Sequence, residues 1–133
     1  MKHFALSALS ACLLLLSSCS GPSHEALMEQ TTDQLTKVAD TLESVKDKAS
    51  WEAAKPKLDA VMTSIESIGK EVKALGEPDA ETKKKLDEKM TKSMASFTQR
   101  MGAAMQKLMQ VEGIGEDVQK FMTDFSKRMS AMK

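Results

Sequence analysis

The sequence predicts an all-α fold, an elongated antiparallel bundle of three or four helices with coiled-coil-like heptad packing. Beyond the N-terminal segment the chain is rich in Ala, Leu, Met, Lys and Glu, which are all good helix formers. Apolar residues recur there at spacings of three and four, which places them on one face of a helix, and no stretch alternates like a half-buried strand. Short connections between the periodic stretches favour antiparallel neighbours.

The first helix is expected over residues 24–48. Ser23 precedes it as an N-cap, and Glu25 in the first turn suits the positive end of the helix dipole. The apolar residues of this helix follow a heptad repeat. They are Met28, Thr31, Leu35, Val38, Leu42, Val45 and Ala49.

The second helix is expected over residues 51–75. Its apolar residues are Trp51, Ala54, Leu58, Val61, Ile65, Ile68, Val72 and Leu75. This stripe is shifted by two positions relative to the first, so a turn is predicted near Ala49-Ser50. Pro56 lacks a backbone donor and clashes with the carbonyl four residues before it. The helix therefore either begins near Lys55 or has kinked first turns.

Residues Gly76-Glu77-Pro78 separate the second helix from a third over 79–111, because Gly accepts a left-handed C-cap and Pro suits the first helical turn. The apolar stripe of the third helix consists of Leu86, Met90, Met94, Phe97, Met101, Ala104, Met105, Leu108 and Val111. At 1.5 Å per residue such a helix would be about 50 Å long, so the bundle is elongated or the helix bends near Gly102.

Gly113 and Gly115 mark the break before a fourth helix over residues 115–132. Its apolar residues are Val118, Phe121, Phe125, Met129 and Met132. Each of the four helices has one polar and one apolar face, and each therefore needs partners.

The first residues have the three features of a secretory signal. Met1, Lys2 and His3 form a basic start, a largely apolar run covers residues 4–16, and small residues follow. The run is shorter than the roughly 20 apolar residues of a membrane-spanning helix. We therefore expect residues 1–18 to be removed during export.

The end of this segment, Leu16-Ser17-Ser18-Cys19, resembles the lipobox of bacterial lipoproteins. The resemblance covers residues 1–19 and implies that Cys19 receives a diacylglycerol, that the chain is cleaved after Ser18, and that palmitate-type acyl chains anchor the protein. Residues 19–23 then form the lipidated cysteine and a short linker, and residues 24–133 form the helical bundle domain. Ser20, and not Asp, follows Cys19, which resembles the pattern sorted to the outer membrane of Gram-negative bacteria and implies that the domain faces the periplasm.

The mature composition excludes several classes of function. Its 18 Lys and Arg oppose 19 Asp and Glu, which argues against broad nucleic-acid binding, since that needs a basic surface. Cys19 and His24 are the sole mature cysteine and histidine, so disulfides, thiolate metal sites, histidine-based zinc sites and catalytic triads are excluded. No cofactor and no catalytic residue is predicted, and we expect a non-enzymatic protein.

Most charged residues are expected to support the helices. Six acid–base pairs have the favourable spacing of four residues, worth about 0.2 to 0.5 kcal/mol each. They are Asp33/Lys37, Glu66/Lys70, Glu81/Lys85, Glu88/Lys92, Glu116/Lys120 and Asp124/Arg128. The run Lys83-Lys84-Lys85 lies among acidic residues that cancel most of its field, so a solvated face is favoured over a site for anionic head groups.

Methionine is the one chemically distinctive residue type, since eight of the ten mature methionines lie between Met90 and Met132. Thioethers four residues apart can hold Cu(I), a soft cation. The residues with that spacing are Met90, Met94, Met101, Met105 and Met109. Most of them share the apolar stripe of the third helix, and Met is an adaptable core residue. Core packing is therefore the favoured interpretation, except for Met109, which lies about 100° from the centre of the stripe and is expected to be exposed.

Three functions remain open at this point. The favoured one is a lipid-anchored helical interaction or structural module of the bacterial cell envelope, with a protein partner or self-association supplying missing burial. The first alternative is a carrier of lipid or other apolar cargo, because methionine-rich surfaces repack around varied ligands and Gly69 permits close approach of another helix. The second alternative is periplasmic Cu(I) binding.

Overall fold

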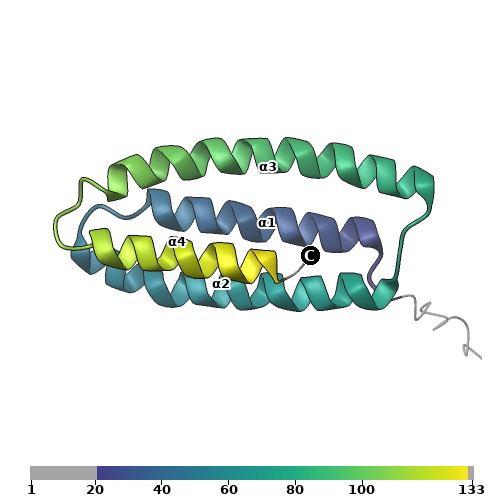
Figure 1. Cartoon of the computed structure of the whole chain (residues 1–133), viewed down its shortest axis with the longest axis horizontal. Helices are drawn as coiled ribbons and strands as arrows, with labels where there is room; N and C mark the ends of the chain where they lie inside the picture. Colours follow the sequence, from purple (N-terminus) through teal and green to yellow (C-terminus); the bar gives the residue numbers. More distant parts are fainter. Residues whose placement is uncertain (1–20, 132–133) are drawn as a thin grey trace, which may run out of the picture.

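The computed structural model describes residues 21–131 and has four helices that run alternately up and down the long axis of the molecule (Figure 1). They are α1 (His24–Glu43), α2 (Lys48–Leu75), α3 (Ala80–Leu108) and α4 (Gly115–Ser130). The described part of the chain contains no strand. The predicted all-α bundle is thus confirmed, in its four-helix form.

The helix α1 occupies a central position, because it packs against both α2 and α3, whereas α4 packs against α2. Phe97 of α3 and Phe125 of α4 bring these two helices into contact, with their ring centroids 5.9 Å apart. The helix α4 has 16 residues, against 28 in α2, and ends part-way along the bundle (Figure 1). One half of the bundle therefore has four helices and the other half three.

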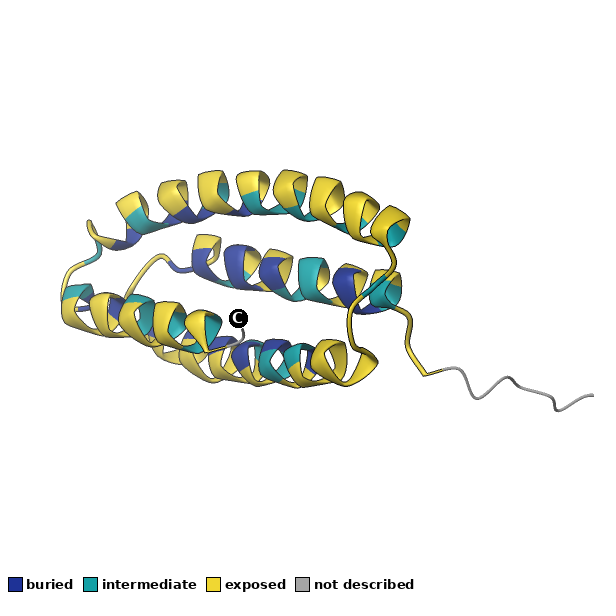
Figure 2. Cartoon of the chain, turned by 45° about the vertical axis from the view of Figure 1, so that its right-hand side comes forward, coloured by how far each residue is buried: buried dark blue, intermediate teal, exposed yellow. Residues whose placement is uncertain are grey.

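The core runs along the inward faces of all four helices, while their outer faces are exposed (Figure 2). Trp51 is the largest fully buried side chain, at 1% exposure. The apolar periodicity of the sequence identified most of the core correctly. It missed Leu27, Ala39, Met62 and Ile114, which are all buried. The predicted members Val72 and Leu75 are exposed, because no helix covers the last turns of α2 on this side.

The connection between α1 and α2 differs from the prediction. The first helix ends at Glu43 and not at residue 48, and the second begins at Lys48, ahead of the predicted turn. The side chain of Asp47 accepts a 2.7 Å hydrogen bond from the backbone N–H of Ser50, and the Ser50 hydroxyl bonds back to Asp47. The Ser50 N–H and then its hydroxyl lower the pKa of Asp47. This reciprocal capping box decides where α2 begins.

Pro56 neither starts nor interrupts α2, which continues through it in the third turn. A start near Lys55 is therefore wrong. Pro56 is exposed, so the carbonyl of Glu52, which loses its helical donor, lies on the wet side of the helix where water can hydrate it. The helix keeps its start because the capping box and the buried Trp51 stabilise the turns before the proline.

The helix α3 also runs unbroken, through Gly102, and arches gently over its length (Figure 1). Its 29 residues give about 44 Å at 1.5 Å per residue. Of the two predicted alternatives, the elongated bundle is the correct one. The helix ends at Leu108, three residues before the predicted end.

The two predicted glycine breaks are present. Gly76 and Gly113 have φ angles of 77° and 79°, a region that is costly for residues with a side chain. Asp79, and not Pro78, caps α3. The hydroxyl of Thr82 and then its backbone N–H lower the pKa of Asp79. Within residues 21–131, no helix combines the length and the apolarity that crossing a bilayer requires.

Candidate functional site

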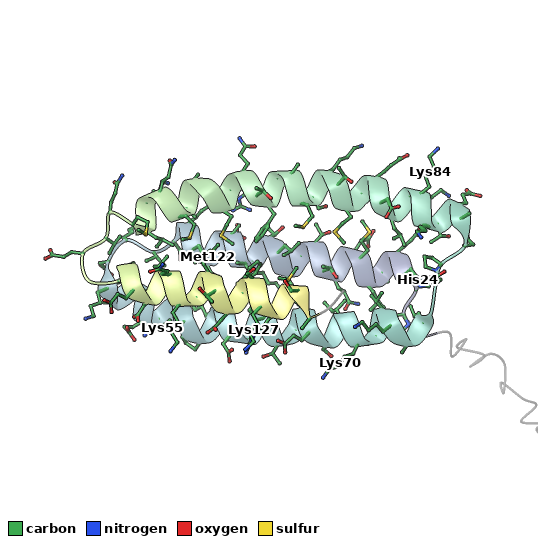
Figure 3. The ribbon with its side chains drawn as sticks, in the orientation of Figure 1. His24, Lys55, Lys70, Lys84, Met122 and Lys127 are labelled. Carbon is green, nitrogen blue, oxygen red and sulfur yellow. The ribbon has the colours of Figure 1, made fainter. Side chains whose placement is uncertain are left out.

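The predicted signal residues 1–18 and the predicted lipidation site Cys19 lie outside the described residues, which begin at Gly21. Ser23 caps α1 as predicted, because its hydroxyl accepts a 3.2 Å hydrogen bond from the N–H of Ala26. The neighbouring His24 Nε2 donates to the carbonyl of Gly76 over 2.9 Å (Figure 3). The entry of the chain into α1 is thus joined to the connection between α2 and α3.

A cleft of about 270 Å³ lies between the first half of α2 and α4. Its apolar lining comes from Trp51, Leu58, Met62, Phe121 and Phe125, and its charged rim from Lys55, Asp59, Asp117, Lys120, Asp124 and Arg128. The aromatic rings continue from one helix to the next. Trp51 and Phe121 meet edge to face with centroids 6.2 Å apart, and Phe121 and Phe125 follow at 6.0 Å. The α2–α4 cleft is therefore an apolar surface with a charged border.

Most of the charges on this border are already paired with one another. Asp117 accepts a 3.3 Å hydrogen bond from the Trp51 indole and lies 3.7 Å from Lys55. The hydrogen bond from Lys55 to Glu52, followed by the charges of Glu52 and Asp117, raises the pKa of Lys55. Arg128 of α4 pairs with Asp59 and Glu66 of α2 at 3.1 and 3.3 Å. These pairs hold α4 over the cleft and leave few polar groups for a charged ligand.

A second charged cluster joins α3 to α1. Arg100 binds both carboxylate oxygens of Glu43, at 2.8 and 2.7 Å, and contacts Asp40 at 2.6 Å. The bidentate geometry matches the fork of the guanidinium to the carboxylate. These hydrogen bonds lower the pKa of Glu43 and raise that of Arg100. The cluster fixes the register of the two helices. It is a structural element, because both carboxylates are bound by Arg100.

The prediction of six ion pairs within helices is largely wrong. Among the described residues, the pair Glu81/Lys85 forms at 2.8 Å, and the other five acid–base combinations lie beyond ion-pair distance. Arg128 pairs across to α2 rather than with Asp124. Exposed pairs within a helix are worth little, and both Arg128 and Glu66 have their ion-pair partner on a neighbouring helix instead.

The methionines predicted as candidate Cu(I) ligands differ widely in exposure. Met101 is buried at 7%, Met94 and Met105 pack against the core while partly buried, and Met90 is partly buried. Met109 is 65% exposed. This range agrees with core packing of Met94, Met101 and Met105, while Met109 lies on the surface. On α4, Met122 also packs against the core (Figure 3).

Cuprous titration tests the copper hypothesis directly. We expect the triple variant Met101→Leu, Met105→Leu and Met109→Leu to bind Cu(I) no more weakly than the unsubstituted chain, since leucine keeps the packing and removes the thioethers. A lower stoichiometry or affinity in the variant would establish a copper site.

The described residues contain no group of three or more His, Cys, Asp or Glu side chains arranged to hold a metal ion. The α2–α4 cleft and the two arginine clusters were not found from the sequence. They depend on which faces of separate helices meet. The only sequence signal for this is the presence of two arginines among many lysines, and that signal is weak.

No protein-family model, curated protein or solved structure matches this chain.

Proposed function

We propose that the protein is a non-enzymatic, lipid-anchored module of the bacterial cell envelope, whose helical bundle acts in interaction or structure. The observation that carries this proposal is the position of Leu16-Ser17-Ser18-Cys19, four residues before the Ser23 cap of α1. A chain of four residues spans at most about 14 Å. The anchor and the folded domain are then almost adjacent, with the domain held at the membrane surface.

Two acyl chains hold a protein firmly, since each buried methylene contributes about 0.8 kcal/mol. A passive role is supported by the two arginines of the chain, because Arg100 and Arg128 with their acidic partners hold helices together. The outer membrane, with the bundle in the periplasm, is the proposed location. The partner of the bundle in this proposal is another envelope protein or a second copy of the chain.

The matched variants Cys19→Ala and Cys12→Ala test the proposal in bacteria. Cys12 lies in the apolar run of the predicted signal, so its substitution controls for general damage to export. We expect Cys19→Ala to abolish incorporation of labelled palmitate and to release the protein from the membrane fraction, while Cys12→Ala behaves like the unsubstituted chain. Membrane association of Cys19→Ala with unchanged processing would refute the lipid anchor.

A second candidate function is the binding of an apolar cargo, and the aromatic lining of the α2–α4 cleft favours it. Trp51 is the only tryptophan, so its fluorescence reports on this cleft. A fatty acid brominated on its chain should quench Trp51 on contact, while the unbrominated parent should not. Equal emission with the two fatty acids, together with no lipid co-purifying in native mass spectrometry, would remove this candidate.

A further inference from the structure

The end of the bundle nearest the predicted anchor is formed by the start of α1, the last turn of α2, the connection 76–79 and the start of α3 (Figure 1). We call this the tether end. The hydrogen bond from His24 to Gly76 fixes the α2–α3 connection beside the entry to α1. If the mature chain begins at Cys19, four residues of at most about 3.5 Å each join the acylated sulfur to the Ser23 cap. The tether end is therefore the part of the domain closest to the predicted anchor.

Two of the three exposed large apolar side chains of the described residues lie at this end. Val72 and Leu75 are 38% and 39% exposed. They follow Ile68, which is 6% exposed, at spacings of four and three and so continue the same face of α2. The helix α4 does not extend to cover them. The third exposed residue, Met109, lies at the opposite end of the bundle, where α3 stops.

Four lysines near this end of the bundle, two on α2 and two on α3, have no ion-pair partner among residues 21–131. They are Lys70, Lys73, Lys83 and Lys84. Figure 3 shows Lys70 and Lys84 pointing away from the bundle on α2 and α3. Long lysine side chains can lay their methylenes along an apolar surface and keep the ammonium group among phosphates. Acidic residues such as Glu71 and Glu77 lie among them, so net charge does not drive contact with the membrane.

We propose that the tether end docks onto the phospholipid surface, with Val72 and Leu75 entering the interface and the long axis of the bundle pointing away from the membrane. This inference rests on the proposed lipid anchor and adds a second, non-covalent contact to it. Docking covers the two apolar side chains that the fold leaves exposed. It directs the far end of the bundle, about 44 Å away along α3, into the periplasm.

Fluorescent labels on single cysteines test this orientation in the full acylated protein, reconstituted in vesicles of phosphatidylethanolamine with a minor share of phosphatidylglycerol. Mature Cys19 is blocked by its acyl group, so an introduced thiol reacts alone. The variants Glu77→Cys at the tether end, Glu112→Cys at the far end, and Thr63→Cys and Gln99→Cys on the flanks all replace exposed residues. We expect aqueous iodide to quench the label at residue 77 at least about twofold less than the other three, since interfacial residues lie about 5–10 Å deep.

The double variant Val72→Ser with Leu75→Ser separates docking from tethering. We expect it to float with the vesicles as before and to lose the protection of the label at residue 77. Equal quenching at all four positions in a protein that floats would overturn the docking and leave the anchor standing. Protection of a flank label would also overturn it, in favour of a bundle lying flat.

Failure of the unsubstituted protein to float would overturn the anchor and the docking together. Both substituted side chains are exposed, so the helical content of the double variant should be unchanged by circular dichroism. If it is reduced, the comparison of the four labels in the unsubstituted background decides the question alone.

Discussion

Leucine-to-alanine substitutions at two positions of α2 provide a matched test of the core. Leu58 is 1% exposed and Leu75 is 39% exposed, so the same chemical change is made in one helix on the two sides of the core boundary. Leu58 lies one turn from the buried residues Ala54 and Met62. Leu58 also lies at the apolar floor of the α2–α4 cleft, so the vacated space would be bordered by buried apolar side chains.

The expected losses follow from this burial. Removing three buried carbons at Leu58 costs about 2.4 kcal/mol at roughly 0.8 kcal/mol each. The remaining cavity raises the loss toward about 3 to 4 kcal/mol, within the range of about 2 to 5 observed for such changes. At Leu75 the same carbons are already partly hydrated and leave no closed cavity. The loss in the free energy of unfolding for Leu75→Ala is therefore at most about 1.5 kcal/mol.

Urea unfolding of residues 20–133, followed by far-UV circular dichroism, measures the two losses. Equal slopes of the free energy against urea would show that the substitutions act on stability and not on the denatured state. We expect Leu58→Ala to lose at least about 1.5 kcal/mol more stability than Leu75→Ala, which is a large share of a typical free energy of unfolding. A difference below about 0.5 kcal/mol, the scale of ordinary surface substitutions, would refute the core as described.

Three further predictions concern helix caps, glycines and the arginine cluster. The pKa values of Asp47 and Asp79 are lowered, so their stabilisation is complete above the ordinary aspartate value of about 3.9 and is lost as the pH falls through the lowered values. Asn also caps helices well, so the urea midpoint of the variant Asp47→Asn with Asp79→Asn should fall less in acid than that of the parent chain. Gly102 lies in open space within α3, so Gly102→Ala should raise the free energy of unfolding by about 0.5 to 1 kcal/mol. Gly113 has a φ of 79°, so Gly113→Ala should lower it by about 1 to 2 kcal/mol. Thermal melts that rank the two variants in the opposite order would contradict this. Arg100→Lys should lower the urea midpoint, because an ammonium group cannot reproduce the bidentate contact, and an unchanged midpoint would show that the cluster does not stabilise the bundle.

Apolar periodicity predicted the number and order of the helices and most of their buried faces, because amphipathic patterns are local. The α1–α2 boundary was misplaced because Val45 continues the apolar repeat of α1 and is buried although it lies in the connection. Asp47 and Ser50, three residues apart, were the local signal that would have located the start of α2.

The contacts between helices could not be predicted from the sequence, for a different reason. The pairing of Arg100 with Glu43, and of Arg128 with Asp59, depends on the relative register of helices far apart in the sequence. The same holds for the α2–α4 cleft, whose lining comes from two helices that no local pattern aligns. The exposure of Leu75 likewise reflects the length of α4 and not any property of α2 itself.

The intact mass of the protein extracted from bacterial membranes tests the lipid anchor most directly. The account predicts a chain that begins at Cys19 and carries the additional mass of a diacylglycerol, with or without a further acyl group on its amino terminus. A chain that still contains residues 1–18, or one that begins at Cys19 without added mass, would contradict it.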